Sequence, residues 1–255
     1  MASREWNEID LQENKFEDYY CAFLDILGYK NRLNLFFQGK FNLYGRVQRA
    51  LNYARIGVPP ADSPDGIITR IFSDSIIVTA PKKETSIDLM INYISILVSS
   101  FSYEGLFLRG GISHGRLFES NSNEYPFLAS EGLVNAYKME TEAKYPMIVI
   151  DNSLVSEVSS KTHIVQFENK HILNFARYII NENAKNEADV IAELEEIKRI
   201  KDSISIEDIK TKYEWLINYY LWFIELCNEK DSSFDMSKFS HLYNERNKSF
   251  IFTSC

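Results

Sequence analysis

Two apolar runs in the first third of the chain each carry one aspartate beside a segment that is expected to form a buried strand. Asp25 follows the run 19–24, and Asp74 lies between the β-branched runs 67–72 and 75–80. Burying an ionised carboxylate is unfavourable unless a cation meets it. A chain with this pattern must therefore fold so that positive charge reaches both carboxylates, and the pair indicates a bound metal.

Composition restricts the fold and the class of partner. With 255 residues, 45% of them hydrophobic, the chain is long enough for one large domain or one domain with an appendage. The net charge of −8 argues against nucleic acid or anionic lipid as a partner, although a local cationic pocket could hold one phosphorylated ligand. Three widely spaced cysteines favour the reducing cytoplasm. No apolar run approaches the roughly 20 residues of a membrane span, so we expect no membrane partner.

The first 158 residues alternate between strand and helix patterns. Strands are expected at 19–24, 67–72, 75–80 and 147–150, and helices at 31–37, 43–56, 86–102 and within 127–142. Asp74 then lies at or near the tip of a hairpin. The segment 106–118 contains Gly110, Gly111 and Gly115 and predicts strand, bend and strand, a second hairpin. This order predicts an α+β fold, with helices packed on one face of a mainly antiparallel sheet.

The chain changes character after about residue 160. Helical patterns cover 172–180, 188–200 and 206–227, and the only comparable strand is a short run at 250–252. The last helix carries a dense aromatic face, which we expect to pack into the core. The sequence therefore predicts a first domain at 16–158 and a helical extension at 159–255 packed on it.

Asp25 and Asp74, with the backbone carbonyl of Ile26, would make an oxygen-only site suited to Mg²⁺ or Mn²⁺. Such a site implies phosphate chemistry, in which two ions clamp the attacking and leaving oxygens. The turn Ile26-Leu27-Gly28-Tyr29 would point backbone N–H groups at the phosphates of a substrate. The alternative is that each aspartate only caps a turn.

Four motifs in order, spread over roughly residues 20 to 152, resemble those of class III nucleotide cyclases. They are Phe-Leu-Asp-Ile-Leu-Gly-Tyr at 23–29, Phe-Ser-Asp at 72–74, Leu-Arg-Gly-Gly-Ile-Ser-His-Gly at 108–115, and Gly-Leu-Val-Asn-Ala-Tyr-Lys-Met-Glu at 132–140 with the strand 145–151 after it. The residue sequences of these motifs are most similar to those of the bacterial antiphage branch, the Pycsar-type pyrimidine cyclases. The resemblance implies the ferredoxin-like cyclase fold, with two metal ions held by Asp25, Asp74 and the Ile26 carbonyl.

The resemblance gives Arg70 the role of reading the base, because it lies four residues before Asp74, where the family places its base-reading residue. The donors of a guanidinium suit carbonyl acceptors such as uracil O2 and O4 and suit the adenine edge poorly. A solvated strand arginine is the alternative. Of the remaining motif residues, Arg109 is expected to pair with a nearby carboxylate and His114 to be hydrogen-bonded.

The family's catalytic helix carries an asparagine that orients the ribose and, one turn later, an arginine that neutralises the phosphate. This chain has Asn135 and Lys138, spaced by three rather than four and with lysine for arginine. Lysine acts as a point charge without the bidentate fork. Matching Lys138 to the arginine leaves Val134 at the asparagine position, so either Asn135 serves with a shifted register or the ribose contact is lost or rebuilt. Both residues would otherwise be ordinary helix surface.

By resemblance, then, we expect a lyase that converts UTP to cyclic UMP and pyrophosphate, a messenger for a separate effector in antiphage defence. Cytidylate cyclase, making cyclic CMP from CTP, is one alternative, since both bases share O2. A catalytically silent domain that binds a nucleotide or dimerises is another. The family pattern assigns Arg70 and Asp74 to different halves of an active site, so a homodimer with two shared sites is expected.

Overall fold

The computed structural model describes residues 16–55, 66–82, 87–120, 127–178, 180, 187–231, 234–243 and 246–255. The strands are β1 (Glu17–Ile26), β2 (Ile68–Phe72), β3 (Ser75–Pro81), β4 (Leu108–Glu119), β5 (Leu128–Ser130), β6 (Ile148–Ile150), β7 (Ile164–Phe167), β8 (Lys170–Leu173) and β9 (Phe252–Ser254). The helices are α2 (Tyr29–Phe37), α3 (Leu43–Arg55), α4 (Ile87–Tyr103), α5 (Glu131–Glu142), α6 (Asn152–Val155), α7 (Phe175–Arg177), α8 (Glu187–Asp202), α9 (Glu207–Asp231) and α10 (Ser240–Tyr243), with 3-10 turns η1 (Lys161–His163) and η3 (Met236–Phe239).

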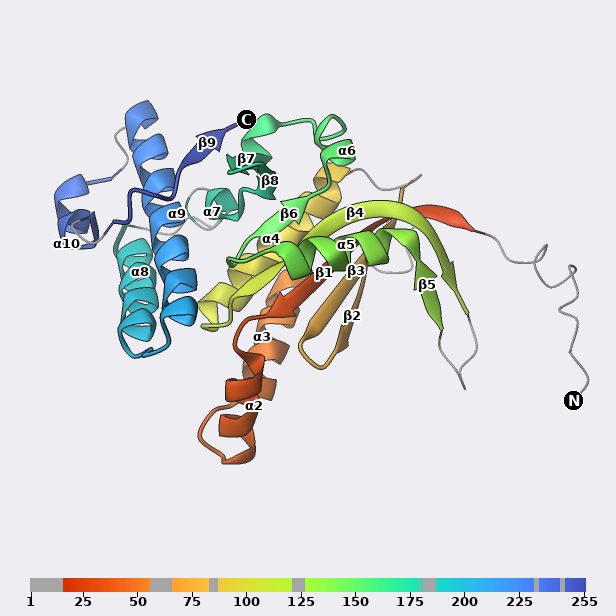
Figure 1. Ribbon diagram of the computed structural model, residues 1–255, viewed down its shortest axis with the longest axis horizontal. Coiled ribbons are helices and arrows are strands. Elements are labelled where there is room, and N and C mark those ends of the chain that lie inside the picture. The colour runs from red at the N-terminus through yellow and green to blue at the C-terminus, as the bar shows by residue number, and fades with distance from the viewer. Residues whose placement is uncertain are drawn as a thin grey trace, which may run out of the picture.

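One twisted sheet organises the described part of the chain (Figure 1). Its strand order is β2-β3-β1-β4-β6-β8-β7-β9, with β5 paired to β4 outside this path. All of these pairs are antiparallel except β4 with β6, which is parallel. The mainly antiparallel α+β fold expected from the sequence is therefore confirmed. None of the helices in the described ranges combines the length and apolar character needed to cross a bilayer.

Helices cover both faces of the sheet rather than the single face that was expected (Figure 1). In β1, Tyr20, Leu24 and their same-face neighbours are buried in the core that α4 closes. The opposite face of β1 lies under α5, where the ring of Phe23 contacts Tyr137 with centroids 5.2 Å apart. Because side chains alternate along a strand, β1 has both of its faces covered in this way. The face under α5 is also the face that carries Asp25.

β4 is one continuous strand and not the expected hairpin. It pairs with β1 without interruption, from Leu108 opposite Ile26 to Leu117 opposite Glu17. A Cβ atom on Gly111 would lie 2.5 Å from the carbonyl oxygen of Ala136, closer than such atoms approach. The glycine therefore lets α5 lie close on the strand, and this close approach, rather than a bend, explains why glycine stands there.

The segment after residue 158 extends the sheet as well as adding helices. The expected helix at 172–180 was wrong at its start, because Ile172 pairs with β6 as part of β8, and α7 begins at Phe175. β7 and β8 were not anticipated as strands. The aromatic face of α9 is buried as expected, with Trp215 and Tyr219 fully enclosed. The division of the chain near residue 158 stays a prediction.

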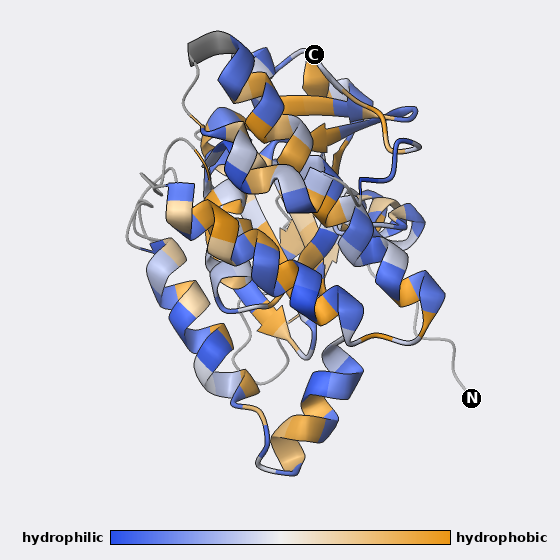
Figure 2. Ribbon diagram, turned by 90° about the vertical axis from the view of Figure 1, so that its left-hand side faces the viewer, coloured by the Kyte–Doolittle hydropathy of each residue, from blue (hydrophilic) through white to orange (hydrophobic). Residues whose placement is uncertain are grey.

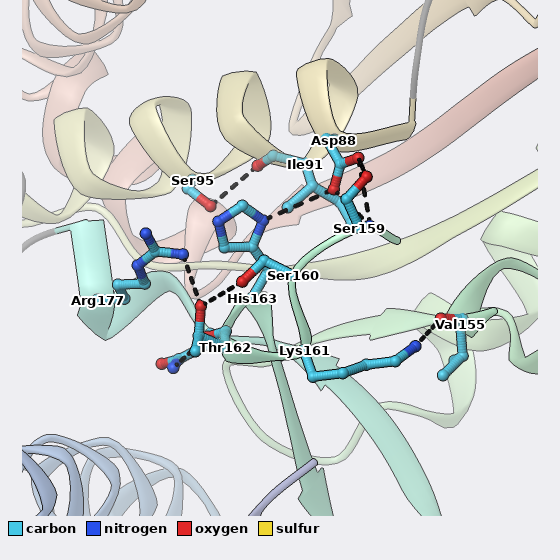
Figure 3. A network of polar contacts seen from close by, with 11 residues as sticks. Asp88, Ile91, Ser95, Val155, Ser159, Ser160, Lys161, Thr162, His163 and Arg177 are labelled. Atoms are coloured by element: carbon cyan, nitrogen blue, oxygen red, sulfur yellow. Dashed lines mark hydrogen bonds and ion pairs between the residues drawn. The ribbon is translucent and has the colours of Figure 1, made fainter. Parts of the chain in front are cut away.

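Polar contacts hold the beginning of this segment against α4 (Figure 3). Asp88, in the first turn of α4, accepts hydrogen bonds from the backbone N–H of Ser159 at 3.0 Å and from its hydroxyl at 2.5 Å. His163 Nδ1 lies 4.0 Å from the same carboxylate. The junction is thus anchored to the helix that closes the core. Ser86, the expected first residue of this helix, lies outside the described residues.

α2 stands away from the sheet and forms the lower end of the molecule in Figures 1 and 2. It contains no buried residue, and its last residue, Phe37, is 77% exposed. Figure 2 shows hydrophobic bands along this helix. Its position matters for the site, because α2 begins directly after the turn that follows β1.

Candidate active site

The fold brings Asp25 and Asp74 to the same corner of the sheet. Asp74 lies in the two-residue turn between β2 and β3, in which Ser73 adopts a positive φ of 59°. The carbonyl oxygen of Asp74 accepts a hydrogen bond from the backbone N–H of Ile26 at 3.0 Å. Asp25 pairs in register with Ser75 of β3. The end of β1 and the tip of the hairpin therefore meet at one edge of the sheet.

The surroundings of Asp25 disfavour its negative charge. Burial, followed by the carboxylate of Glu140, raises its pKa, and Asp74 adds to the increase. The guanidinium of Arg109 opposes these effects, yet the pKa of Asp25 still rises from 3.8 to about 6. A carboxylate perturbed in this way is typical of functional sites. A bound cation would favour the charged form of both aspartates.

Arg109 is the cation in direct contact with Asp25. Its Nε lies 2.6 Å from an oxygen of Glu140, while one of its terminal nitrogens is 3.5 Å from Asp25. Its other terminal nitrogen donates to the carbonyl of Ala143 at 3.3 Å. Arg109 therefore makes its shortest contact with Glu140, a residue that sequence reasoning missed. The expectation that Arg109 pairs with a nearby carboxylate is confirmed.

The donor set fits a hard divalent cation. Two carboxylates and neighbouring backbone carbonyls are oxygen ligands of the kind that Mg²⁺ and Mn²⁺ take. The carboxylates of Glu140 and Asp74 raise the pKa of Asp25, while the positive charges of Arg109 and Lys212 lower it. Within the described ranges, no group of three or more His, Cys, Asp or Glu side chains was found that could hold a metal. Because Glu140 is paired with Arg109, Asp25 and Asp74 are the side-chain ligands proposed for this corner.

The turn after β1 leads directly into a helix N-terminus. Gly28 precedes α2 in the left-handed conformation, with φ 72°, and no side chain caps the helix. The N–H groups of Ile26 and Leu27 are bonded to the carbonyls of Asp74 and Phe107, so they are not directed at a ligand as was expected. The first turn of a helix has N–H groups without intrahelical partners, which attract anions. In this chain that turn begins at Tyr29.

Arg70 points away from the aspartate pair of its own chain. It stands opposite Ile77, on the sheet face that also carries Phe23. One terminal nitrogen donates to the hydroxyl of Thr79 at 3.1 Å, and the other lies 2.5 and 2.6 Å from the two oxygens of Glu119. Both contacts draw the guanidinium toward the far end of β3. The structure does not bring Arg70 to the predicted metal ligands.

Asn135 and Lys138 lie exposed on the outer surface of α5. Among the described residues, no hydrogen bond or ion pair links either of them to Asp25 or Asp74. Asn135 lines an open cavity of about 760 Å³ together with His114, whose Nε2 lies 3.2 Å from the hydroxyl of Ser153. His114 is therefore hydrogen-bonded, as expected. The two predicted catalytic residues are accessible, but they are separate from the aspartates of the same chain.

No family model and no curated protein matches this chain. Its fold is similar to solved nucleotide cyclases. They include the adenylyl cyclase CyaB from P. aeruginosa (12% identity over 64% of this chain and 96% of that chain, TM-score 0.47) and the guanylate cyclase domain of RhGC from Catenaria anguillulae (14%, 61%, 93% and 0.42). A bacterial light-regulated adenylyl cyclase has 14% identity and a TM-score of 0.48, and this chain spans 53% of its length. These low values identify neither a substrate nor a site residue.

Proposed function

We propose that this protein is a metal-dependent class III nucleotide cyclase that converts UTP to cyclic UMP and pyrophosphate. The observation that carries the proposal is the pair of aspartates, Asp25 and Asp74, at one sheet edge beside the uncapped N-terminus of α2. A cation site next to an anion site is what a metal-bound triphosphate requires. The four cyclase-like motifs, which contain both aspartates, support the same reaction.

Asp25, Asp74 and the backbone carbonyl of Ile26 would hold two Mg²⁺ or Mn²⁺ ions. Bound there, the ions would supply charge neutralisation at the phosphates and favour the deprotonated nucleophile. Arg109 pairs with Glu140 and also contacts Asp25. It therefore acts as a positioning residue for the Asp25 carboxylate. The first-turn N–H groups of α2, beginning at Tyr29, would bind phosphate oxygens.

The reaction is an in-line displacement at phosphorus. The 3′-hydroxyl oxygen of UTP forms a bond to the α-phosphorus, and the bond from that phosphorus to the bridging oxygen of the β-phosphate breaks. Pyrophosphate takes the electron pair and leaves, and the hydroxyl proton is released to solvent. Lys138 would neutralise the charge on the transferring phosphoryl group, and Asn135 would orient the ribose.

We assign Arg70, Asn135 and Lys138 to the partner's half of each site in a homodimer. Arg70 turns away from the aspartates of its own chain, and the two helix residues are exposed and unconnected to that pair. A second copy with its α5 face over the first would supply all three. Each dimer would then contain two sites built from both chains.

Uracil is the favoured base because the donors of Arg70 suit its carbonyl oxygens. CTP is the nearest alternative substrate, since cytosine shares O2. The residue sequences of the motifs support a role in antiphage defence, with cyclic UMP acting on a separate effector in the cytoplasm. A silent nucleotide-binding or dimerising domain is the second candidate, and the lysine at 138 and valine at 134 favour it.

The test is to incubate the purified protein with each of the four NTPs and Mn²⁺ and to separate the products by mass. Cyclic UMP from UTP is the expected product. Cyclic AMP as the main product would reject the pyrimidine assignment, and no cyclic product from any of the four would reject the enzyme. An Asp74→Asn variant, purified in parallel, controls for a contaminating cyclase.

A further inference from the structure

The last residue of β4 contacts a residue of β2, although two strands lie between β2 and β4 in the sheet. β4 curves strongly along its length (Figure 1), although β2 and β4 are separated by β3 and β1 in the strand order. Glu119, the last residue of β4, contacts Arg70 across this curve with both carboxylate oxygens within 2.6 Å of one guanidinium nitrogen. Two residues 49 positions apart in the chain thus form one pair on the face that carries Phe23.

The pair is accessible to a ligand and held in place. The Arg70 side chain is 30% exposed and that of Glu119 is 38% exposed. Thr79 fixes the second terminal nitrogen of Arg70, so the guanidinium is oriented before any ligand arrives. Arg70 offers only donors, whereas a carboxylate offers only acceptors, and both groups keep capacity beyond their mutual contact. Together they present a donor next to an acceptor.

Nucleobases differ in the order in which they present these groups. Uracil places a carbonyl at position 4 beside a ring N–H at position 3, and guanine has the same order at positions 6 and 1. Cytosine and adenine have the reverse order, an amino group beside an unprotonated ring nitrogen. A fixed donor and acceptor pair therefore matches one order and opposes the other, because the mismatched order sets donor against donor and acceptor against acceptor.

We propose that Glu119 is a second base-reading residue, which accepts the N3–H of uracil while Arg70 donates to O4. The inference rests on the proposed cyclase function, and it deepens that function by giving the site a reason to prefer UTP over CTP. Arg70 alone gives no such preference, since both bases carry O2. A simple surface ion pair would leave the choice of base unaffected.

The experiment is a competition between UTP and CTP in one reaction, with Mn²⁺ and products separated by mass. The product ratio reports relative kcat/KM and does not depend on how much of a variant is folded. Wild-type protein is compared with Glu119→Gln and with the charge swap Arg70→Glu/Glu119→Arg. Glu196→Gln is the control, because it breaks an ion pair of similar length, with Arg199 at 2.6 Å, on the exposed surface of α8.

We expect Glu119→Gln to reduce the UTP preference by about tenfold or more, and the charge swap to turn the preference toward CTP. Glu196→Gln should keep the wild-type ratio. An unchanged ratio in Glu119→Gln and in the swap would overturn the base-reading role while leaving the cyclase intact.

Equilibrium binding of UTP and CTP to the same variants separates this inference from the proposed function. If the wild type binds UTP selectively but forms no product, the cyclase is rejected. Loss of that selectivity in Glu119→Gln would then still support base recognition by Arg70 and Glu119, and retained selectivity would reject it. A wild-type protein that binds neither nucleotide would reject base recognition by Arg70 and Glu119.

Discussion

The corner that carries Asp25 and Asp74 differs sharply from the surface of α5 that carries Asn135 and Lys138. The first is built by pairing of β1 with β3 and by the contact of Ile26 with the hairpin turn, and its charge is perturbed by burial. The second consists of exposed side chains on one helix. A single chain therefore positions the predicted metal ligands. It does not bring the predicted transition-state residues, Asn135 and Lys138, to those ligands.

The two groups of predicted site residues are held in position in different ways. The aspartates are held by strands whose register fixes them, whereas Asn135 and Lys138 depend on whatever is placed against α5. In an active site, charge-stabilising groups must be oriented before reaction. If Asn135 and Lys138 of α5 stabilise the transition state, a second copy of the chain must hold their side chains in position.

The largest expected effect is from removing a metal ligand. Asp74→Asn should lower the rate of cyclic product formation by about 10³-fold or more, because charge stabilisation by the metal is worth several kcal/mol. It should also weaken Mn²⁺ binding, measured by calorimetry. Asp202→Asn is the matched control, since that carboxylate is 51% exposed near the end of α8. Full activity in Asp74→Asn would refute the metal assignment.

A smaller loss is expected on the α5 side. Lys138→Met removes the charge and should lower kcat by about 10²-fold, the usual effect of losing one charge-stabilising group. Lys138→Arg keeps the charge and adds the fork, so it should retain or raise the activity. Because Lys138 is exposed, neither variant should change the unfolding temperature. Equal rates for the methionine and arginine variants would remove Lys138 from the site.

The smallest effect concerns pH. The folded-state pKa of Asp25 is raised to about 6, so protonation at Asp25 stabilises the metal-free fold at low pH. That stability is present below about pH 4 and is lost as the pH rises through about 6. Above this range, Asp25→Asn should stabilise the metal-free protein by on the order of 1 kcal/mol, after allowance for solvent screening.

Denaturant unfolding at pH 4 and pH 7.5, with chelator present, measures this difference. The variant and the wild type should be similar at the lower pH. Mn²⁺ affinity of the wild type should rise across the same interval, because the ion competes with the proton. A variant that is less stable than the wild type at pH 7.5 would contradict the electrostatic account of Asp25.

The strand and the hairpin that carry the two aspartates were predictable from local signals, whereas their adjacency depends on the long-range pairing of β1 with β3. The β-branched runs around Ser73 and Asp74 specify a hairpin, and the apolar run before Asp25 specifies the strand that it joins. The structure of 106–118 was not predictable, since glycines serve either a bend or a close approach. Only the packing of α5, which a Cβ on Gly111 would block, decides between the two.

The contacts of the charged residues depended on distant parts of the chain. Glu140 lies in a recognised motif, yet its pairing with Arg109 follows from how α5 is placed on β4. Glu119 reaches Arg70 only because β4 curves, and its position after an apolar strand gave no sign of this. β7 and β8 were missed because short runs within a helical segment do not reveal the sheet that accepts them.

The most direct test is to mix two variants that are each strongly impaired. Asp74→Asn and Lys138→Met are each purified, combined in equal amounts, allowed to exchange subunits, and assayed for cyclic UMP. If each site takes its aspartates from one chain and Lys138 from the other, mixed dimers contain one intact site, and about a quarter of the wild-type activity should return. An active wild type whose mixed variants form no more product than the variants do separately would contradict the shared site.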